Sequence, residues 1–198
     1  MRVVGAVGLS VRRAAVFDTS IGPCGLAWQE GALTLVLLPA GDAAATRSLL
    51  RHLAGVEVGG EGKSGIEAAR EPRPAFVDDA ITAMQALLRG EAVSLTHVPL
   101  AWQRVGDFER RVYEAAQRLA PGDTTTYGEM ARTLGDAAAA RAVGVALGRN
   151  PWPLVVPCHR VLAAGGKLGG FSAPGGVATK ERLLAIEAPL ARRAGELF

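Results

Sequence analysis

Short apolar runs separated by turn residues open the chain, a pattern typical of β-strands. Three strands are predicted, at Val11–Phe17, Gly25–Trp28 and Leu33–Leu38. Gly22-Pro23 separates the first two and Glu30-Gly31 the last two, and both pairs favour turns. Connections this short predict a meander or hairpin sheet.

The pattern then changes to a helical period. Asp42–Ala54 is predicted to be a helix. Its apolar face is expected to hold Leu49, Leu50 and Leu53. Pro74–Arg89 is predicted to be a second helix that ends at Gly90. Between these helices, Gly55–Gly65 is glycine-rich and polar, which predicts a loop.

A second group of helices begins at Asp107. The first of them has an apolar face at helical spacing, which consists of Phe108, Val112, Ala115 and Leu119. Pro121-Gly122 ends this helix. Thr126, with Glu129 three residues later, fits a capping box and predicts a helix through Leu134.

Gly135 ends that helix, and Asp136 is expected to cap the next one, Ala137–Leu147, which Gly148 ends. Two short helices joined by a tight turn predict a helix-turn-helix, although any two packed helices share this pattern. The second helix carries alanines around one long cation, Arg141. Small residues let a backbone approach DNA closely, and one long side chain can replace a base in the stack. The pattern therefore favours a minor-groove or base-extruding protein, while alanine is also simply a good helix former.

Composition excludes several classes of protein. Of the 198 residues, 49% are hydrophobic and 21% charged, which is ordinary for a globular chain and too apolar for a disordered tail. The uncharged, mostly apolar stretch Gly31–Gly41 is too short to span a bilayer. The net charge is +3, and the basic excess lies in residues 104–198, where 13 Lys and Arg stand against nine Asp and Glu. This excess is compatible with a polyanionic partner.

Two segments are similar to motifs that their surroundings do not support. Gly62-Lys63-Ser64 is similar to the end of a phosphate-binding P-loop, but Glu57 stands where that motif needs a glycine. We interpret the segment as a solvated loop, with nucleotide binding as the alternative. Arg2 and the apolar run Val3–Val11 loosely resemble a signal peptide, but Arg12-Arg13 interrupts the run and no small-residue cleavage site follows. We interpret this region as the approach to the first strand.

The chemically informative segment is Pro151–Val161, which reads PWPLVVPCHRV. An apolar run precedes Cys158, His159 and Arg160. A lone cysteine is usually an inert core residue, an interpretation that suits Cys24. Cys158 differs because a titratable histidine and a cation stand beside it, and such neighbours favour the nucleophilic thiolate.

The sequence Pro157-Cys158-His159-Arg160-Val161 resembles the active-site motif of the O6-alkylguanine-DNA alkyltransferases, also called methylated-DNA–protein-cysteine methyltransferases. Further segments follow in the order and spacing of that family: Asp107–Leu134, Ala139–Gly144, Asn150-Pro151 and Gly169–Glu187. The resemblance is strong from Asp107 to Glu187 and loose over the first half, chiefly at Thr19–Trp28.

The resemblance implies two domains. An N-terminal α/β domain with a ribonuclease-H-like sheet, residues 1–92, is joined by a linker, residues 93–106, to a mostly α-helical C-terminal domain. That domain, residues 107–188, is expected to be winged-helix-like and to contain the helix-turn-helix. Both DNA binding and alkyl transfer are assigned to it, and residues 189–198 form a tail. The implied activity is direct-reversal DNA repair, in which one protein molecule takes one alkyl group from O6-alkylguanine in double-stranded DNA after flipping the base.

The resemblance also implies the catalytic residues. Cys158 accepts the alkyl group, and His159 acts through a water as general base. Glu187 orients the histidine. We predict a helix over Thr179–Glu187, which places Glu187 near a helix C-terminus, where the dipole disfavours a carboxylate unless it has a specific partner. Tyr127 crowds the phosphate and donates a proton or hydrogen bond to the departing base, and Asn150 is a hinge between the recognition helix and the cysteine segment.

The remaining implied contacts are with DNA. Arg141 is the finger that fills the gap left by the flipped base. The other DNA-binding residues are Ala138, Ala139, Ala140, Ala142, Gly144 and Tyr127. Main-chain groups of Val161 and Ser172 contact the flipped guanine, although the loop Gly170–Gly176 is longer than in many members. Lys180 matches a family lysine whose role the resemblance does not assign.

We expect no metal, because Cys24 has no second cysteine nearby and the histidines are scattered. We also expect no cofactor, no membrane association, a monomer, and a reducing cytoplasm. Two alternatives remain: a non-reactive sensor that flips alkylguanine, whose known examples replace the cysteine, and a Cys-His-Glu thiol hydrolase.

Overall fold

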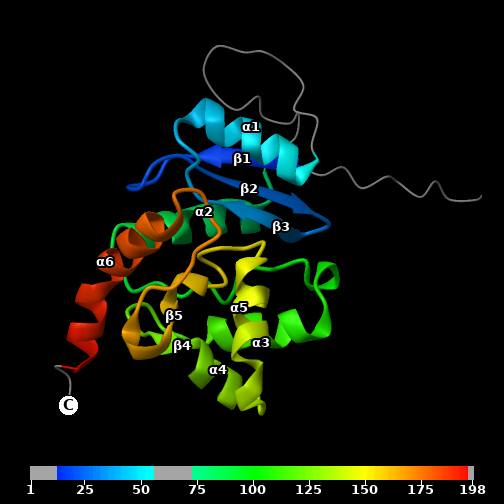
Figure 1. Cartoon of the computed structure of the whole chain (residues 1–198). Helices are drawn as coiled ribbons and strands as arrows, with labels where there is room; N and C mark the ends of the chain where they lie inside the picture. The colour runs from blue at the N-terminus through cyan, green and yellow to red at the C-terminus, as the bar shows by residue number, and fades with distance from the viewer. Residues whose placement is uncertain (1–12, 56–72, 196–198) are drawn as a thin grey trace, which may run out of the picture.

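The computed structural model describes residues 13–55 and 73–195. The expectations for Val3–Val11 and for Gly62-Lys63-Ser64 lie outside these residues. The described chain begins with a three-stranded antiparallel meander in the order β1-β2-β3, as the turn pattern predicts (Figure 1). Its strands are β1 (Arg13–Phe17), β2 (Cys24–Gln29) and β3 (Ala32–Leu37).

Two helices cover the two faces of this sheet (Figure 1). They are α1 (Ala43–Ala54), which Asp42 caps through a bond from the Ala45 N–H, and α2 (Ala75–Leu88). Because side chains alternate along a strand, Ala27 packs under α1 while Leu26 packs toward α2.

The predicted apolar face of α1 is wrong at one residue, Leu53. The buried residues of this helix are Thr46, Leu50 and Ala54, while Leu49 is half-buried and Leu53 is 53% exposed. These buried positions are spaced by four residues and form one narrow stripe. Leu49 also packs against this cluster, so Leu53 is the predicted face residue that the sheet leaves exposed.

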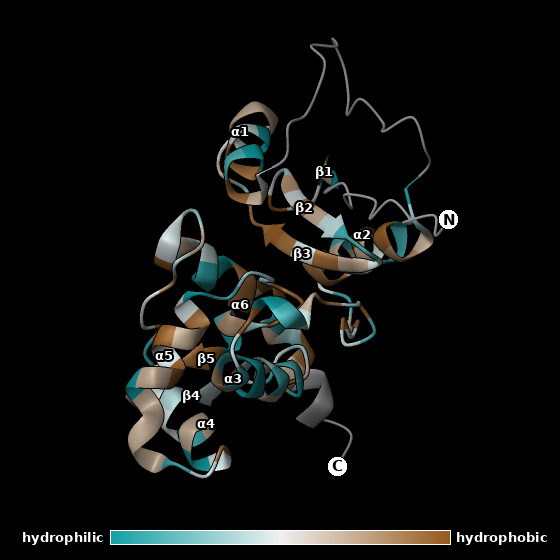
Figure 2. Cartoon of the chain, turned by 90° about the vertical axis from the view of Figure 1, so that its right-hand side faces the viewer, coloured by the Kyte–Doolittle hydropathy of each residue, from teal (hydrophilic) through white to brown (hydrophobic). Residues whose placement is uncertain are grey.

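The segment predicted as a linker packs against the sheet. Leu33 at the edge of β3 donates its N–H to the Pro99 carbonyl at 2.8 Å and accepts from the Ala101 N–H at 3.0 Å. Leu95, Val98 and Leu100 are buried in the main core, and a short helix, η1 (Trp102–Arg104), follows. That core contains residues of both halves of the chain. In Figure 2 much of β3 and α2 is brown, the colour of hydrophobic residues. The domain boundaries themselves stay a prediction.

The helices of the second half lie together below the sheet in Figure 1. They are α3 (Asp107–Gln117), α4 (Tyr127–Thr133), η2 (Ala137–Ala139), α5 (Ala140–Gly148), η3 (Cys158–Arg160), η4 (Ala164–Gly166) and α6 (Gly176–Gly195). The capping box of Thr126 and Glu129 is confirmed, as is the cap by Asp136, whose carboxylate accepts from the Ala138 N–H at 2.9 Å. A two-stranded parallel pair, β4 (Thr125–Thr126) and β5 (Val161–Leu162), joins the start of α4 to the end of η3.

The predicted extent of the last helix is wrong. α6 (Gly176–Gly195) continues past the predicted end at Glu187. Glu187 therefore lies inside α6, and the expected conflict with a helix C-terminus does not arise. Pro189 lies within this helix, although a proline usually ends or kinks one.

Candidate active site

The loop before Cys158 is closed by the side chain of Asn150. Its Oδ1 accepts from the Trp152 N–H at 2.9 Å, and its Nδ2 donates to the Val156 carbonyl at 2.8 Å. Within this loop the buried residue Leu154 has φ +75°, a conformation that L-residues rarely adopt. Such strain costs on the order of 1–3 kcal/mol and persists only where neighbours impose it. Through these two hydrogen bonds, Asn150 links the end of α5 to the segment that leads to Cys158. Its role as a hinge stays a prediction.

The sheet of the first half holds the same loop. Trp152 is fully buried, and its Nε1–H donates to the Leu33 carbonyl at 2.9 Å. The Val36 N–H donates to the Pro151 carbonyl at 2.8 Å. The indole also packs edge-on against Trp102, with ring centroids 5.4 Å apart. Trp152 was not among the predicted site residues, although an aromatic residue between two prolines shortly before Cys158 was a visible signal.

Cys158 begins the short helix η3 and is buried. Burial raises the pKa of its thiol. Hydrogen bonding from Asn150, the positive charge of Lys180 and nearby main-chain N–H groups act in the opposite direction and offset only part of this rise in pKa. The resting cysteine is therefore a thiol, and a base must remove its proton before it can act as a nucleophile.

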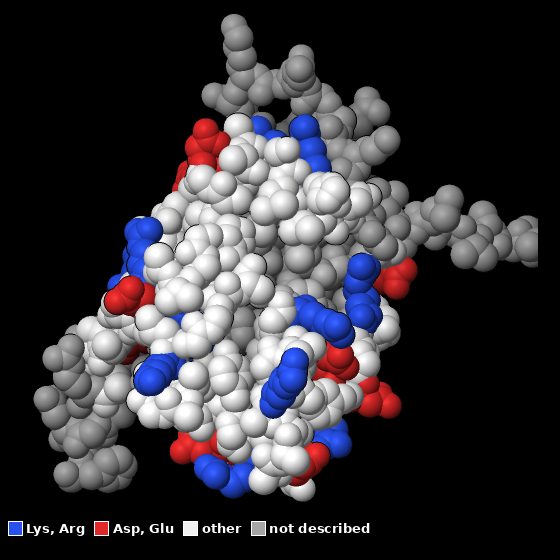
Figure 3. Space-filling view, viewed as in Figure 1, with Lys and Arg blue, Asp and Glu red and all other residues white. Residues whose placement is uncertain are grey.

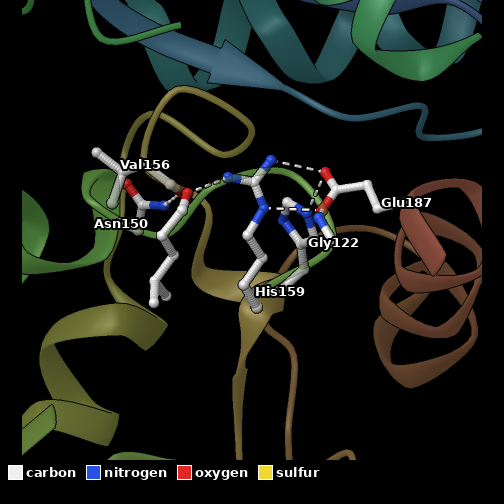
Figure 4. A network of polar contacts seen from close by, with 7 residues as sticks. Gly122, Asn150, Val156, His159 and Glu187 are labelled. Atoms are coloured by element: carbon white, nitrogen blue, oxygen red, sulfur yellow. Dashed lines mark hydrogen bonds and ion pairs between the residues drawn. The ribbon is translucent and has the colours of Figure 1, made fainter. Parts of the chain in front are cut away.

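A buried carboxylate, Glu187, gathers the polar groups that follow Cys158 (Figure 4). Its Oε1 accepts from His159 Nε2 at 3.1 Å and from Arg160 Nη2 at 2.8 Å, and its Oε2 accepts from Arg160 Nε at 2.8 Å. Burial alone would raise the pKa of Glu187, but the bonds and charges of His159 and Arg160 outweigh it and lower this pKa to about 2. Glu187 is ionised at neutral pH.

His159 is fully buried, and burial lowers its pKa, with Glu187 acting in the opposite direction. The imidazole is therefore neutral at pH 7. An ionised carboxylate can only accept hydrogen bonds, so the ring proton lies on Nε2. Nδ1 then carries a lone pair, and it has no hydrogen-bond partner among the described residues. The geometry leaves His159 with a basic nitrogen, as a general base requires.

Arg160 was not among the predicted site residues. Its guanidinium forms the two-pronged ion pair with Glu187 and also donates from Nη1 to the Leu119 carbonyl at 2.6 Å. Two parallel N–H···O bonds to one carboxylate fix its plane as well as its position. The cation beside the cysteine therefore acts on Glu187 rather than on the sulfur.

Lys180 from α6 is also fully buried. Its Nζ donates to the Val161 carbonyl at 2.7 Å and lies 5.8 Å from the centre of the Tyr127 ring. Burial lowers the pKa of Lys180, while the thiolate form of Cys158 would raise it. Because its charge faces Cys158, Lys180 favours the thiolate electrostatically.

Tyr127 opens α4 and is half-buried. Burial raises the pKa of its hydroxyl, which therefore stays protonated and able to donate. Gly144 is half-buried beside this ring, since a Cβ there would lie 3.9 Å from the ring carbons. The structure thus brings Tyr127, Lys180 and Val161 together beside Cys158.

Apart from Tyr127, the residues predicted to contact DNA lie on η2 and α5. The loop before α6 reaches the Tyr127 ring, since a Cβ on Gly169 would lie 3.4 Å from it. Arg141, Ala138 and Ala142 are exposed and line a shallow hollow with Glu109 and Val145, while Ala139 and Ala140 are half-buried. Ser172 is exposed on the loop before α6. On the face shown in Figure 3, Lys and Arg side chains are scattered around a broad uncharged area.

Within residues 13–55 and 73–195, no three His, Cys, Asp or Glu side chains are grouped so that they would hold a metal ion. No helix in that part of the chain is long and apolar enough to cross a membrane.

Comparison with known proteins gives consistent matches. Residues 107–189 match the family model for the 6-O-methylguanine DNA methyltransferase DNA-binding domain. A methylated-DNA–protein-cysteine methyltransferase of Methanosarcina acetivorans is 35% identical over 175 residues, which cover 87% of this chain and 96% of that protein. One of Mycolicibacterium paratuberculosis is 51% identical over 84 residues, 42% of this chain and 50% of that protein.

Solved structures agree. The O6-methylguanine methyltransferase of Mycobacterium tuberculosis superposes with a TM-score of 0.67 and 32% identity, covering 90% of this chain and 94% of that one. A structure of Mycobacterium tuberculosis OGT in complex with DNA gives a TM-score of 0.64 and 31% identity, with 90% of this chain and 94% of that one covered. Together with the buried Cys158–His159–Glu187 arrangement, these matches show that the chain belongs to the methylated-DNA–protein-cysteine methyltransferase family.

Proposed function

We propose that this protein repairs DNA by direct reversal, moving an alkyl group from O6-alkylguanine in double-stranded DNA to the sulfur of Cys158. The observation that carries the proposal is the neutral His159, held by the ionised Glu187 with its basic nitrogen free and adjacent in sequence to a buried thiol. The relatives and the DNA-binding family model support the choice of DNA as partner.

The transfer takes place in two steps. Nδ1 of His159 takes the proton of Cys158 through a water, and Glu187 stabilises the resulting imidazolium. The thiolate, favoured by Lys180, then attacks the alkyl carbon from the side opposite the guanine oxygen. A carbon–sulfur bond forms, the carbon–oxygen bond breaks, and its electron pair goes to the base. Tyr127 donates a proton or hydrogen bond to the departing guanine, and Val161 and Ser172 hold that base through main-chain groups.

The alkyl carbon is unreachable inside a duplex, so the nucleotide must first leave the stack. Arg141 is exposed on α5 and is the side chain proposed to fill the gap. The proposed minor-groove contacts around it are those of Ala138, Ala139, Ala140, Ala142 and Gly144. The first-half sheet is proposed to be ribonuclease-H-like and the second half winged-helix-like, with the domain boundaries given above.

Titration with excess alkylated DNA is expected to reach a plateau at about one alkyl group per protein molecule, because Cys158 is a single activated nucleophile and a thioether has no ready leaving group. Intact-protein mass spectrometry measures the adduct. A stable adduct of the alkyl mass supports the proposal. An unchanged mass would instead indicate a non-reactive sensor, and several transfers per molecule a hydrolase.

Arg141→Ala is expected to slow repair of duplex DNA about tenfold or more, because extruding a base costs a few kcal/mol that the finger offsets. Transfer from the free O6-alkylguanine base should change less than about twofold, since no base has to leave a stack. Single-turnover rates on the two substrates measure the difference. Equal losses on both would assign Arg141 to the fold or to the chemistry.

The rate of transfer from the free base is expected to be flat near pH 7–8 and to fall in acid, below the ordinary histidine pKa of about 6.5. The rate falls in acid because protonation removes the basic form of His159. Burial lowers the pKa of His159, so this form persists below the ordinary value. Circular dichroism at each pH separates loss of the base from unfolding. A rate that instead climbs through pH 8–9, as for an unassisted thiol, would contradict the role of His159.

A further inference from the structure

Glu187 is approached from a second side by the turn that follows α3. The Asp123 N–H donates to the Ala120 carbonyl at 3.0 Å and closes a four-residue turn, with Pro121 second and Gly122 third. Gly122 has φ +93°, as the third position of a type II turn requires. Both residues were predicted only as the end of a helix.

Main-chain groups of this segment reach the carboxylate and its partner. The Gly122 N–H donates to Glu187 Oε2 at 3.2 Å, and the Leu119 carbonyl accepts from Arg160 Nη1 at 2.6 Å (Figure 4). Leu119 therefore fixes the guanidinium that holds Glu187, and Gly122 fixes Glu187 directly. The turn and Arg160 thus hold the Glu187 carboxylate from two sides. Its Oε1 also accepts the hydrogen bond from His159.

The backbone of α6 lies directly against Gly122. A Cβ on this residue would stand 2.6 Å from the Ala191 nitrogen and 3.1 Å from the Glu187 carbonyl oxygen. Both neighbours are main-chain atoms of a helix, which cannot rotate away as a flexible side chain would. Glycine is thus required here by its positive φ and by the closeness of α6.

We infer that Gly122 is a positioning residue for alkyl transfer, because its N–H and its missing side chain together set Glu187 and, through Glu187, the ring of His159. The inference rests on the proposed function. It assigns the role to the segment from Leu119 to Gly122, which reaches His159 through Arg160 and Glu187.

Gly122→Ala is the direct test, since the added methyl group must displace either the turn or α6. A displacement of about 1 Å at a catalytic group can cost on the order of a hundredfold in rate, so we expect transfer from the free base to fall by about tenfold to a hundredfold. Gly31→Ala is the matched control. Gly31 also has a positive φ, +79°, but nothing lies within 4 Å of its Cβ position and it belongs to the β2–β3 hairpin. Its transfer rate should stay within about twofold, because it bears the same kind of backbone strain far from α6.

A second measurement separates positioning from loss of stability. The Nε2–H of His159, bonded to Glu187 and buried, is expected to give a slowly exchanging imidazole proton signal in NMR spectra in water. The other two histidines, His52 and His97, are exposed. The signal should persist in Gly31→Ala and should shift or vanish in Gly122→Ala.

If Gly122→Ala does not fold, Pro121→Ala takes its place, because it loosens the turn without adding an atom next to α6. We then expect a broadened His159 signal and a rate lowered about twofold to fivefold, since the turn keeps its bonds but loses its preset φ. An unchanged His159 signal in the folded variant, with a rate loss no larger than that of Gly31→Ala, would overturn the inference. If the wild-type protein transfers no alkyl group, the proposed function fails, while the His159 signal still decides whether Gly122 sets the position of Glu187.

Discussion

Replacing Cys158 by serine is expected to abolish alkyl transfer while leaving the affinity for DNA within about twofold, because serine keeps the size of the side chain but is a far weaker nucleophile at neutral pH. The His159–Glu187–Arg160 network does not depend on the sulfur, so the fold and the DNA-binding helices should persist. Intact mass after incubation with alkylated DNA measures the transfer, and fluorescence anisotropy measures the binding.

Cys24→Ser is the matched control for this variant. Cys24 is fully buried in β2, its sulfur lies 3.7 Å from the Thr19 hydroxyl, and burial raises the pKa of its thiol to about 11. No base comparable to His159 contacts this sulfur in the described structure. The Cys24 variant should therefore transfer at the wild-type rate. An inactive Cys24→Ser together with an active Cys158→Ser would show that the nucleophile has been misassigned.

Arg160→Met is expected to lower the free energy of unfolding by about 3–5 kcal/mol, because removing one partner of a buried ion pair leaves the other charge without compensation. Glu187 is only 3% exposed and would keep a weak bond to Gly122 and its bond to His159. The Leu119 carbonyl would lose its donor as well. Urea denaturation followed by circular dichroism measures the loss.

Arg89→Met supplies the comparison, since Arg89 pairs with Glu91 on the surface, with both side chains 53% exposed. Exposed pairs contribute about 0–1 kcal/mol, so this variant should be nearly as stable as the wild type. The cost of Arg160→Met should also shrink in acid. The folded pKa of Glu187 is lowered to about 2, so its stabilising contribution is complete above the unfolded value near 4.5 and is lost between pH 4.5 and 2. Equal losses in the two arginine variants would contradict the account of the buried pair.

The amino-acid sequence by itself determined the features that depend on neighbours a few residues away. The meander follows from turn residues between short apolar runs, and the start of α4 from a capping box whose two partners stand three residues apart. Cys158 was predicted to be the nucleophile in the same local way, from the histidine and the arginine that follow it. Local inference was wrong at Leu53, which is exposed, and at the end of α6, which continues past Glu187.

The tertiary structure alone decided which distant groups meet and which protonation states result. The Trp152 indole donates a hydrogen bond to Leu33, which is 119 positions away in the sequence. Glu187 is hydrogen-bonded to Gly122, 65 positions away, and to Arg160, 27 positions away. No local period signals such partners, because each depends on how helices and strands pack. The low pKa of Glu187 and the neutral, buried His159 likewise depend on the loss of water around them. Local hydrogen bonds and turn geometry are encoded in short segments, whereas desolvation and long-range pairing exist only once the whole core has formed.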